Sequence, residues 1–195
     1  MKINFQKCID NKGCIMNGPL LIEPKVHIDK RGFFQESWNK KVFNDVLIED
    51  NQNPVSFVQD NHSKSSIGTL RGLHYQKEPY AQGKLIRCIS GKIFDVAVDL
   101  RNDSKTFLRY TSIILDSKNH LQFWIPKGFA HGFVSLSGNT QVVYKTTNYW
   151  GKDYELSIKW NDPEININWP IELFKDELKI SKKDSEAPNT KDLKE

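Results

Sequence analysis

The alternation of apolar and polar residues predicts short β-strands along most of the chain. The clearest case is residues 92–100, where Asp95 and Asp99 fall on one face and four apolar side chains fall on the other, namely Phe94, Val96, Val98 and Leu100. Similar patterns predict strands over residues 121–125, 129–136 and 141–147. Many short strands separated by turns favour an all-β sandwich or barrel over a fold of alternating strands and helices.

One short segment has a helical pattern instead. Val42, Phe43 and Val46 fall on one face at helical spacing, and Ser37 is a residue type that caps helix N-termini. The sequence therefore predicts a helix from about Trp38 to Val46 that is capped by Ser37. We expect this helix to lie at the periphery of the strands.

The chain has the length of one compact domain. Its 195 residues are 38% apolar and include 11 Phe and 5 Trp, which is enough for one sizeable core. We expect an N-terminal extension over residues 1–17, a single domain over 18–184 and a polar C-terminal tail over 185–195. Because residues 181–195 are almost wholly polar, we expect this end to lose order after its first few residues.

Charge and cysteine content narrow the class of protein. The net charge is +4, and the 28 Lys and Arg are scattered among 24 acidic residues, which argues against a nucleic-acid partner. A weakly basic protein is still compatible with an anionic small-molecule ligand. The chain has three cysteines in no pairing pattern, no secretory leader pattern and no apolar run long enough for a membrane span. These features predict a soluble protein of the reducing cytoplasm.

A histidine flanked by small and polar residues is the first candidate for chemistry. On an extended strand, Leu70, Gly72, His74 and Gln76 point to one side, so that the imidazole has room for a ligand. A glycine within a strand is expected where another group approaches the backbone closely. The pattern is equally consistent with a hydrogen-bonded core histidine.

A second histidine, His131, follows a turn in residues 126–133. The spacing Pro-x-Gly-x-x-His resembles the second signature of the cupin superfamily, whose members are small jelly-roll barrels. Many cupins bind a metal through His-x-His, a glutamate and this later histidine. Here Gln76 stands in place of the second imidazole and Lys84 adds a positive charge. We therefore expect no metal and no other cofactor.

A pocket with two histidines and a lysine suits proton transfer on an organic substrate. A carbon acid beside a ketone needs a base of near-neutral pKa and a cation at the enolate oxygen, and His74 and Lys84 match these roles. The phenol of Tyr144 is a candidate proton donor, although its strand pattern also fits an ordinary core position. Tyr149 and Trp150 follow this strand, where aromatic rings either stack on a nucleobase or cover the barrel rim.

Taken together, the motifs resemble the dTDP-4-dehydrorhamnose 3,5-epimerase family of metal-free cupins. The matching pieces occur in one order, as Glu23–Val26, Lys30–Ser37, Phe57–Ser63, Arg71–His74, Gln82–Leu85, Asp95–Asp99, Trp124–Phe133 and Trp160–Pro163. The resemblance implies an all-β fold, a cupin-type double-stranded β-helix (jelly-roll barrel) with short peripheral helices. It also implies inversion at C3 and C5 of dTDP-4-dehydro-6-deoxy-D-glucose to give dTDP-4-dehydro-L-rhamnose, in dTDP-L-rhamnose biosynthesis.

The same resemblance implies roles for individual residues. His74 would be the base, oriented by Asp184, while Tyr144 would be the acid on the opposite sugar face and Lys84 would stabilise the enolate. The local sequence alone would predict that Asp184 is a solvated residue of a polar tail. The implied substrate contacts are Arg31, Glu36, Gln59, Asn61, Arg71, His131, Tyr149, Glu155 and Lys183.

The family also implies a homodimer that exchanges N-terminal segments, so that Arg31 would serve the neighbouring site. Instead of binding substrate, Arg31 and Glu36 could form a surface ion pair that contributes little energy. The chain departs from the family pattern in its first 17 residues, in Ser104–Thr106 and in Trp150 after Tyr149. Alternative functions are a single-site epimerase on a related 4-keto sugar nucleotide, a metal-dependent cupin oxygenase or isomerase, and a non-catalytic sugar-binding cupin.

Overall fold

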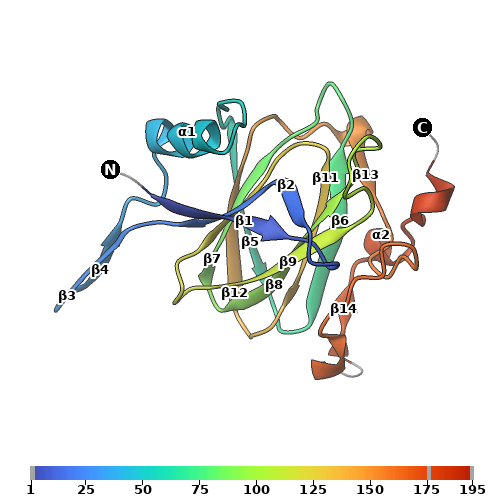
Figure 1. The fold of residues 1–195 in the computed structure, drawn as a ribbon. Helices are drawn as coiled ribbons and strands as arrows, with labels where there is room; N and C mark the ends of the chain where they lie inside the picture. Colours follow the sequence, from blue (N-terminus) through green and yellow to red (C-terminus); the bar gives the residue numbers. More distant parts are fainter. Residues whose placement is uncertain (1–2, 175–176, 194–195) are drawn as a thin grey trace.

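Two facing β-sheets form the body of the protein in the computed structural model, which describes residues 3–174 and 177–193 (Figure 1). The strands are β1 (Asn4–Ile9), β2 (Ile15–Glu23), β3 (Val26–Asp29), β4 (Gly32–Gln35), β5 (Gln59–Ser65), β6 (Thr69–Gln76), β7 (Lys84–Ser90), β8 (Lys92–Asp99), β9 (Tyr110–Asp116), β10 (Gln122–Ile125), β11 (Phe129–Ser135), β12 (Thr140–Thr146), β13 (Glu155–Ser157) and β14 (Lys179–Ile180). The helices are α1 (Lys40–Glu49) and α2 (Lys182–Ser185), with 3-10 turns at η1 (Lys152–Tyr154), η2 (Ile171–Leu173) and η4 (Thr190–Asp192).

The sheet topology confirms the predicted all-β barrel of the cupin type. One six-stranded sheet has the order β1-β2-β10-β7-β12-β5, and the other runs β13-β6-β11-β8-β9 with β14 added parallel to β6. The four strands predicted over residues 92–100, 121–125, 129–136 and 141–147 form as β8, β10, β11 and β12. Apart from β14, the pairs within these two sheets are antiparallel.

Alternation along β8 explains which side chains enter the barrel. Ile93 and Ala97 join the apolar cluster between the two sheets, together with Phe123 of β10 and Val142 of β12. Asp95 shares this inner face with them, as the two-residue period requires. The predicted apolar face, with Val96 and Val98, points the other way and is buried beneath the C-terminal segment.

Helix α1 covers part of the outer face of the first sheet. Phe43, Val46 and Leu47 pack on Leu85 and Trp124. The helix begins later than predicted, because the carboxamide of Asn39, rather than the hydroxyl of Ser37, accepts the free N–H groups of residues 41 and 42. It ends at Glu49 instead of Val46.

Strand β6 departs from the expected alternation. Leu70 packs outside the barrel in the same cluster as Leu73, so the prediction that Leu70 shares the side of His74 is wrong. The cause is a register shift in the pairing of β6 with β11, which moves the side chains before it to the other face. Gly72 is needed here, because a Cβ on this residue would lie 2.5 Å from Cα of Gly132.

Described residues near both termini contact the barrel. Residues 4–9, within the expected extension, form the edge strand β1, and Cys8 joins the inner cluster. At the other end, the expected loss of order is wrong for the described residues, since the N–H of Lys159 donates to Pro188 O and Thr190 donates to Asp162 through N–H and hydroxyl. Residues 194–195 of the expected tail lie outside the described residues. Among the described helices, none is long and apolar enough to cross a membrane.

Candidate functional site

The site is built around a histidine and a carboxylate that are far apart in sequence. His74 is partly exposed on β6, and its Nε2 lies 2.7 Å from Oδ1 of Asp184, which is 3% exposed at α2. The N–H of Gly72 donates to the second oxygen of Asp184 at 3.2 Å. Ser181 caps α2 by accepting the N–H of Asp184. These bonds hold the carboxylate directly behind the imidazole.

The electrostatics of Asp184 favour its charged form. Burial by itself raises the pKa of Asp184, but the hydrogen bond and charge of His74, together with the Gly72 N–H, outweigh burial and lower the pKa. Because the carboxylate accepts a hydrogen bond from Nε2, the neutral imidazole keeps its proton on that nitrogen. Nδ1 then carries the lone pair. The pair therefore presents Nδ1 as a base.

His131 lies beside His74, because the two residues are Cα partners on the adjacent strands β11 and β6. Its Nε2 lies 2.6 Å from Oδ1 of Asp95, and both side chains are buried. Burial lowers the pKa of His131, Asp95 opposes this change, and the positive charge of Lys84, together with any charge on His74, adds to the lowering. The site thus holds a second His–Asp pair.

Lys84 reaches the site from the opposite sheet. It is the first residue of β7, and its Nζ donates to the carbonyl of His74 at 3.4 Å. Burial lowers the pKa of Lys84 to about 8, against the opposing influence of Glu155 and Asp95. A partly buried cation is therefore available beside His74, and it titrates close to neutral pH.

Tyr144 also comes from the sheet opposite His74. It lies on β12 between Asn61 of β5 and Ile86 of β7, and it packs against the inner apolar cluster. Burial raises the pKa of Tyr144, the charge of Glu155 raises it further, and Arg71 opposes both. The phenol therefore keeps its proton at neutral pH.

Other expected contact residues surround these groups. Glu155 of β13 forms an ion pair with Lys183, the neighbour of Asp184. Burial alone raises the pKa of Glu155, but Lys183 and His74 reverse the direction and lower it. Arg71 is exposed on β6 and donates to Ser65 Oγ and to Lys64 O. The site is therefore bordered by the Glu155–Lys183 ion pair and by the guanidinium of Arg71.

A polar and aromatic edge completes the site. Gln59 donates to Oδ1 of Asn61 at 2.9 Å and accepts the N–H of Trp150 at 3.2 Å. The side chains of Tyr149 and Trp150 remain exposed, at 60% and 53%. Gln59 thus connects Asn61 to the backbone segment that carries Tyr149 and Trp150.

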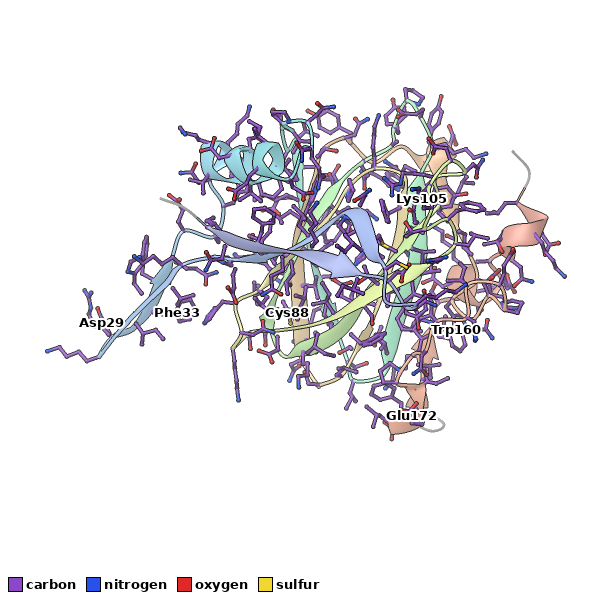
Figure 2. The ribbon with its side chains drawn as sticks, viewed as in Figure 1. Asp29, Phe33, Cys88, Lys105, Trp160 and Glu172 are labelled. Atoms are coloured by element: carbon purple, nitrogen blue, oxygen red, sulfur yellow. The ribbon has the colours of Figure 1, made fainter. Side chains whose placement is uncertain are left out.

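Two expected contact residues lie elsewhere in the same subunit. Arg31 lies in the turn of the β3–β4 hairpin, where its guanidinium pairs with Asp29 at 2.6 Å, and Glu36 directly follows β4. This hairpin projects away from the barrel (Figure 1), and Figure 2 shows Asp29 and Phe33 out on it. A chain alone therefore does not bring Arg31 to His74.

The sequence did not identify Asp95 as a functional residue. Its position, a carboxylate between Ile93 and Ala97 on the inner face of β8, was the available signal, because a charge there needs a partner. Gln76, considered only as a missing metal ligand, is 8% exposed, and its carboxamide bonds to the backbone of two loops.

Known proteins are similar to this chain in both sequence and fold. Residues 14–192 match the family model described as dTDP-4-dehydrorhamnose 3,5-epimerase. The protein of that name from Shigella flexneri is 55% identical to the chain, over 78% of this chain and 82% of the relative. The one from Methanothermobacter thermautotrophicus is 47% identical, over 92% of each chain. A crystal structure of dTDP-6-deoxy-D-glucose-3,5-epimerase from Legionella pneumophila, in complex with dTDP-4-keto-L-rhamnose, superposes with a TM-score of 0.87 at 40% identity, covering 98% of this chain and 95% of that one.

Proposed function

The chain belongs to the dTDP-4-dehydrorhamnose 3,5-epimerase family, and from this membership we propose that it converts dTDP-4-dehydro-6-deoxy-D-glucose to dTDP-4-dehydro-L-rhamnose by inverting C3 and C5. The reaction is an isomerisation in dTDP-L-rhamnose biosynthesis. The observation that carries the proposal is the His74–Asp184 pair, because a carboxylate on Nε2 leaves Nδ1 free to remove a proton from carbon.

In the proposed mechanism, Nδ1 of His74 takes the proton from a carbon next to the C4 ketone. The bonding electrons move to the ketone oxygen and form an enolate, which the ammonium group of Lys84 stabilises. Tyr144 then gives its phenolic proton to the opposite face of the same carbon. The base and the acid exchange protons with solvent before the second carbon reacts. Support comes from the origin of His74 and Tyr144 on opposite sheets.

The substrate contacts are part of the same proposal. Arg71 and Lys183 offer cationic groups to the diphosphate, which favours charge-assisted hydrogen bonds. Tyr149 would stack on the thymine, and Gln59, Asn61, His131 and Glu155 would hold the nucleotide and the sugar. His131 and Glu155 lie beside His74, and Gln59 is hydrogen-bonded to Asn61 and to the backbone that carries Tyr149 and Trp150, which supports these roles.

We further propose a cytoplasmic homodimer in which Arg31 and Glu36 enter the site of the partner. Three apolar side chains on the hairpin, Ile28, Phe33 and Phe34, are 80%, 60% and 70% exposed, which favours burial against another surface. Cys8, Cys14 and Cys88 are free thiols, which suits a reducing compartment.

The decisive experiment follows hydrogen exchange at the two carbons. The enzyme is incubated with the 4-keto sugar nucleotide in heavy water, and C3 and C5 are monitored by NMR. Deuterium at both carbons with formation of the L-rhamno product supports the proposal. Deuterium at one carbon identifies a single-site epimerase, and deuterium at neither refutes the mechanism. Elemental analysis of the purified protein tests the metal-dependent alternative, because that enzyme would contain a stoichiometric metal required for activity.

A further inference from the structure

The carboxamide of Gln76 is fully engaged with backbone groups of two loops. Gln76 ends β6, and its Nε2 donates to Tyr80 O at 2.6 Å and to Tyr149 O at 3.1 Å. Its Oε1 accepts the N–H of Gly151 at 2.7 Å. Both amide hydrogens and the oxygen are therefore used, inside a side chain that is 8% exposed.

These bonds fix the segment that carries the exposed aromatic rings. Gln76 holds the carbonyl of Tyr149 and the N–H of Gly151, while Gln59 accepts the N–H of Trp150 between them. Three consecutive residues are thus anchored through their backbone. The rings of Tyr149 and Trp150 remain exposed, although the backbone that bears them is held.

The loop over residues 77–82 supports the same segment from its other side. Asn148 donates to Pro79 O at 2.8 Å, and Gln82 donates to Asn148 O at 3.0 Å. A Cβ on Gly151 would lie 2.8 Å from Cγ of Tyr80, so the tyrosine ring rests directly on this glycine. Gln76 is the residue that joins the two segments, because it bonds to both of them.

We propose that Gln76 is a positioning residue that holds Tyr149 and Trp150 as a platform for the nucleobase, and so sets the affinity for the nucleoside diphosphate without taking part in proton transfer. The inference rests on the proposed function, which supplies the nucleotide. Aromatic rings that are already in place stack on a base without the entropic cost of ordering their segment at binding.

The test is Gln76→Glu, which preserves shape but replaces the donating NH2 with a carboxylate oxygen facing two carbonyl groups. We expect the Kd for dTDP, measured by calorimetry, to rise about tenfold or more, because two carbonyls lose their donor. The rate of deuterium exchange at saturating substrate should stay within about twofold of wild type, because the variant leaves the proton-transfer groups intact. Inorganic pyrophosphate, which lacks a base, should bind as it does to wild type.

Two further variants separate positioning from general damage. Gln6→Glu makes the same chemical change at an exposed residue of β1 and should leave the affinity for dTDP unchanged. In a chain that already carries Tyr149→Ala and Trp150→Ala, adding Gln76→Glu should weaken dTDP binding little further, because the platform through which it acts is gone. If Gln76→Glu does not fold, Gly151→Ala decides, since its Cβ displaces Tyr80 and should also weaken dTDP selectively.

Unchanged affinity of the folded variant for dTDP, or an equal loss of pyrophosphate binding, overturns the inference. An additive effect in the platform-free background overturns it as well. The dTDP-binding measurements test the role of Gln76 separately from the proposed proton transfer. A wild-type enzyme that binds dTDP but exchanges no deuterium at C3 or C5 refutes the reaction and leaves the role of Gln76 standing.

Discussion

Nε2 of His74 lies 2.7 Å from Oδ1 of Asp184, although 110 residues separate them in the chain. β6, which carries His74, lies in the first half of the chain, whereas Asp184 lies on α2 near the C-terminus. The base is therefore complete only when the C-terminal segment is packed on β6.

We expect His74→Ala to abolish deuterium exchange at both C3 and C5. Removal of a positioned general base costs about 10²- to 10⁴-fold in rate. The measurement is NMR of the substrate in heavy water. His62→Ala is a matched control, because His62 lies on the exposed side of β5 with Gln141 as its partner. Full exchange by His74→Ala would assign the base to another residue.

Asp184→Asn should slow turnover about 10²-fold, because the amide orients the imidazole poorly and does not stabilise its cation. It should also change the acid stability. The folded pKa of Asp184 lies below its ordinary value of 3.8, so the carboxylate stabilises the fold above that pH, and the contribution is lost as pH falls through the folded pKa. Urea unfolding at pH 7 and pH 3 measures this.

The expected result is a smaller loss of stability between pH 7 and pH 3 for Asp184→Asn than for wild type. Asp153→Asn, at an exposed position in η1, should behave as wild type. Equal pH dependence of wild type and Asp184→Asn would contradict the link between this carboxylate and acid stability.

Local sequence pattern could predict only part of this site. His74, Lys84 and Tyr144 belong to strands whose alternation and motifs are visible locally, so their presence in one barrel was predictable. Asp184 was not, because nothing local distinguishes a carboxylate in a polar stretch. Its role depends on a contact across 110 residues, and only the family resemblance pointed to it.

Local pattern also failed where the sequence offers two capping residues. Ser37 and Asn39 are both good caps, and the structure uses Asn39, whose carboxamide accepts the N–H groups of residues 41 and 42. Leu70 faces the opposite side from that predicted because the pairing of β6 with β11 shifts in register. The sequence of β6 alone does not determine this shift.

Tyr144→Phe should separate proton removal from inversion. The variant keeps His74 and Lys84, so exchange of deuterium into the substrate should continue, while formation of the inverted product falls by about 10²-fold without a proton donor on the opposite face. NMR follows exchange, and chromatography of the reduced sugars follows inversion. Loss of both in equal measure would show that the phenol also takes part in proton removal.

Lys84 should give the reaction an alkaline limit. Burial lowers the pKa of this lysine to about 8, so the ammonium form is lost as pH rises through that value, and a neutral amine stabilises an enolate poorly. Turnover at saturating substrate should therefore decline above about pH 8. Lys84→Met should be slow at every pH and show no such decline, whereas Lys105→Met, at an exposed loop, should retain the wild-type profile. A decline of the same midpoint in Lys84→Met would assign it to another group.

The position of Arg31 allows a test of shared sites between subunits. Arg31 lies on the projecting hairpin, so in the proposed homodimer each site would combine His74 of one subunit with Arg31 of its partner. The Arg31→Ala homodimer should be weakly active, and the His74→Ala homodimer should be inactive. A heterodimer of the two variants, purified through two different tags, contains one site with both residues intact and should recover about half of the wild-type activity. Recovery requires that the residues come from different chains. If Arg31 instead acts within its own subunit, each site of the heterodimer lacks one residue and activity stays low.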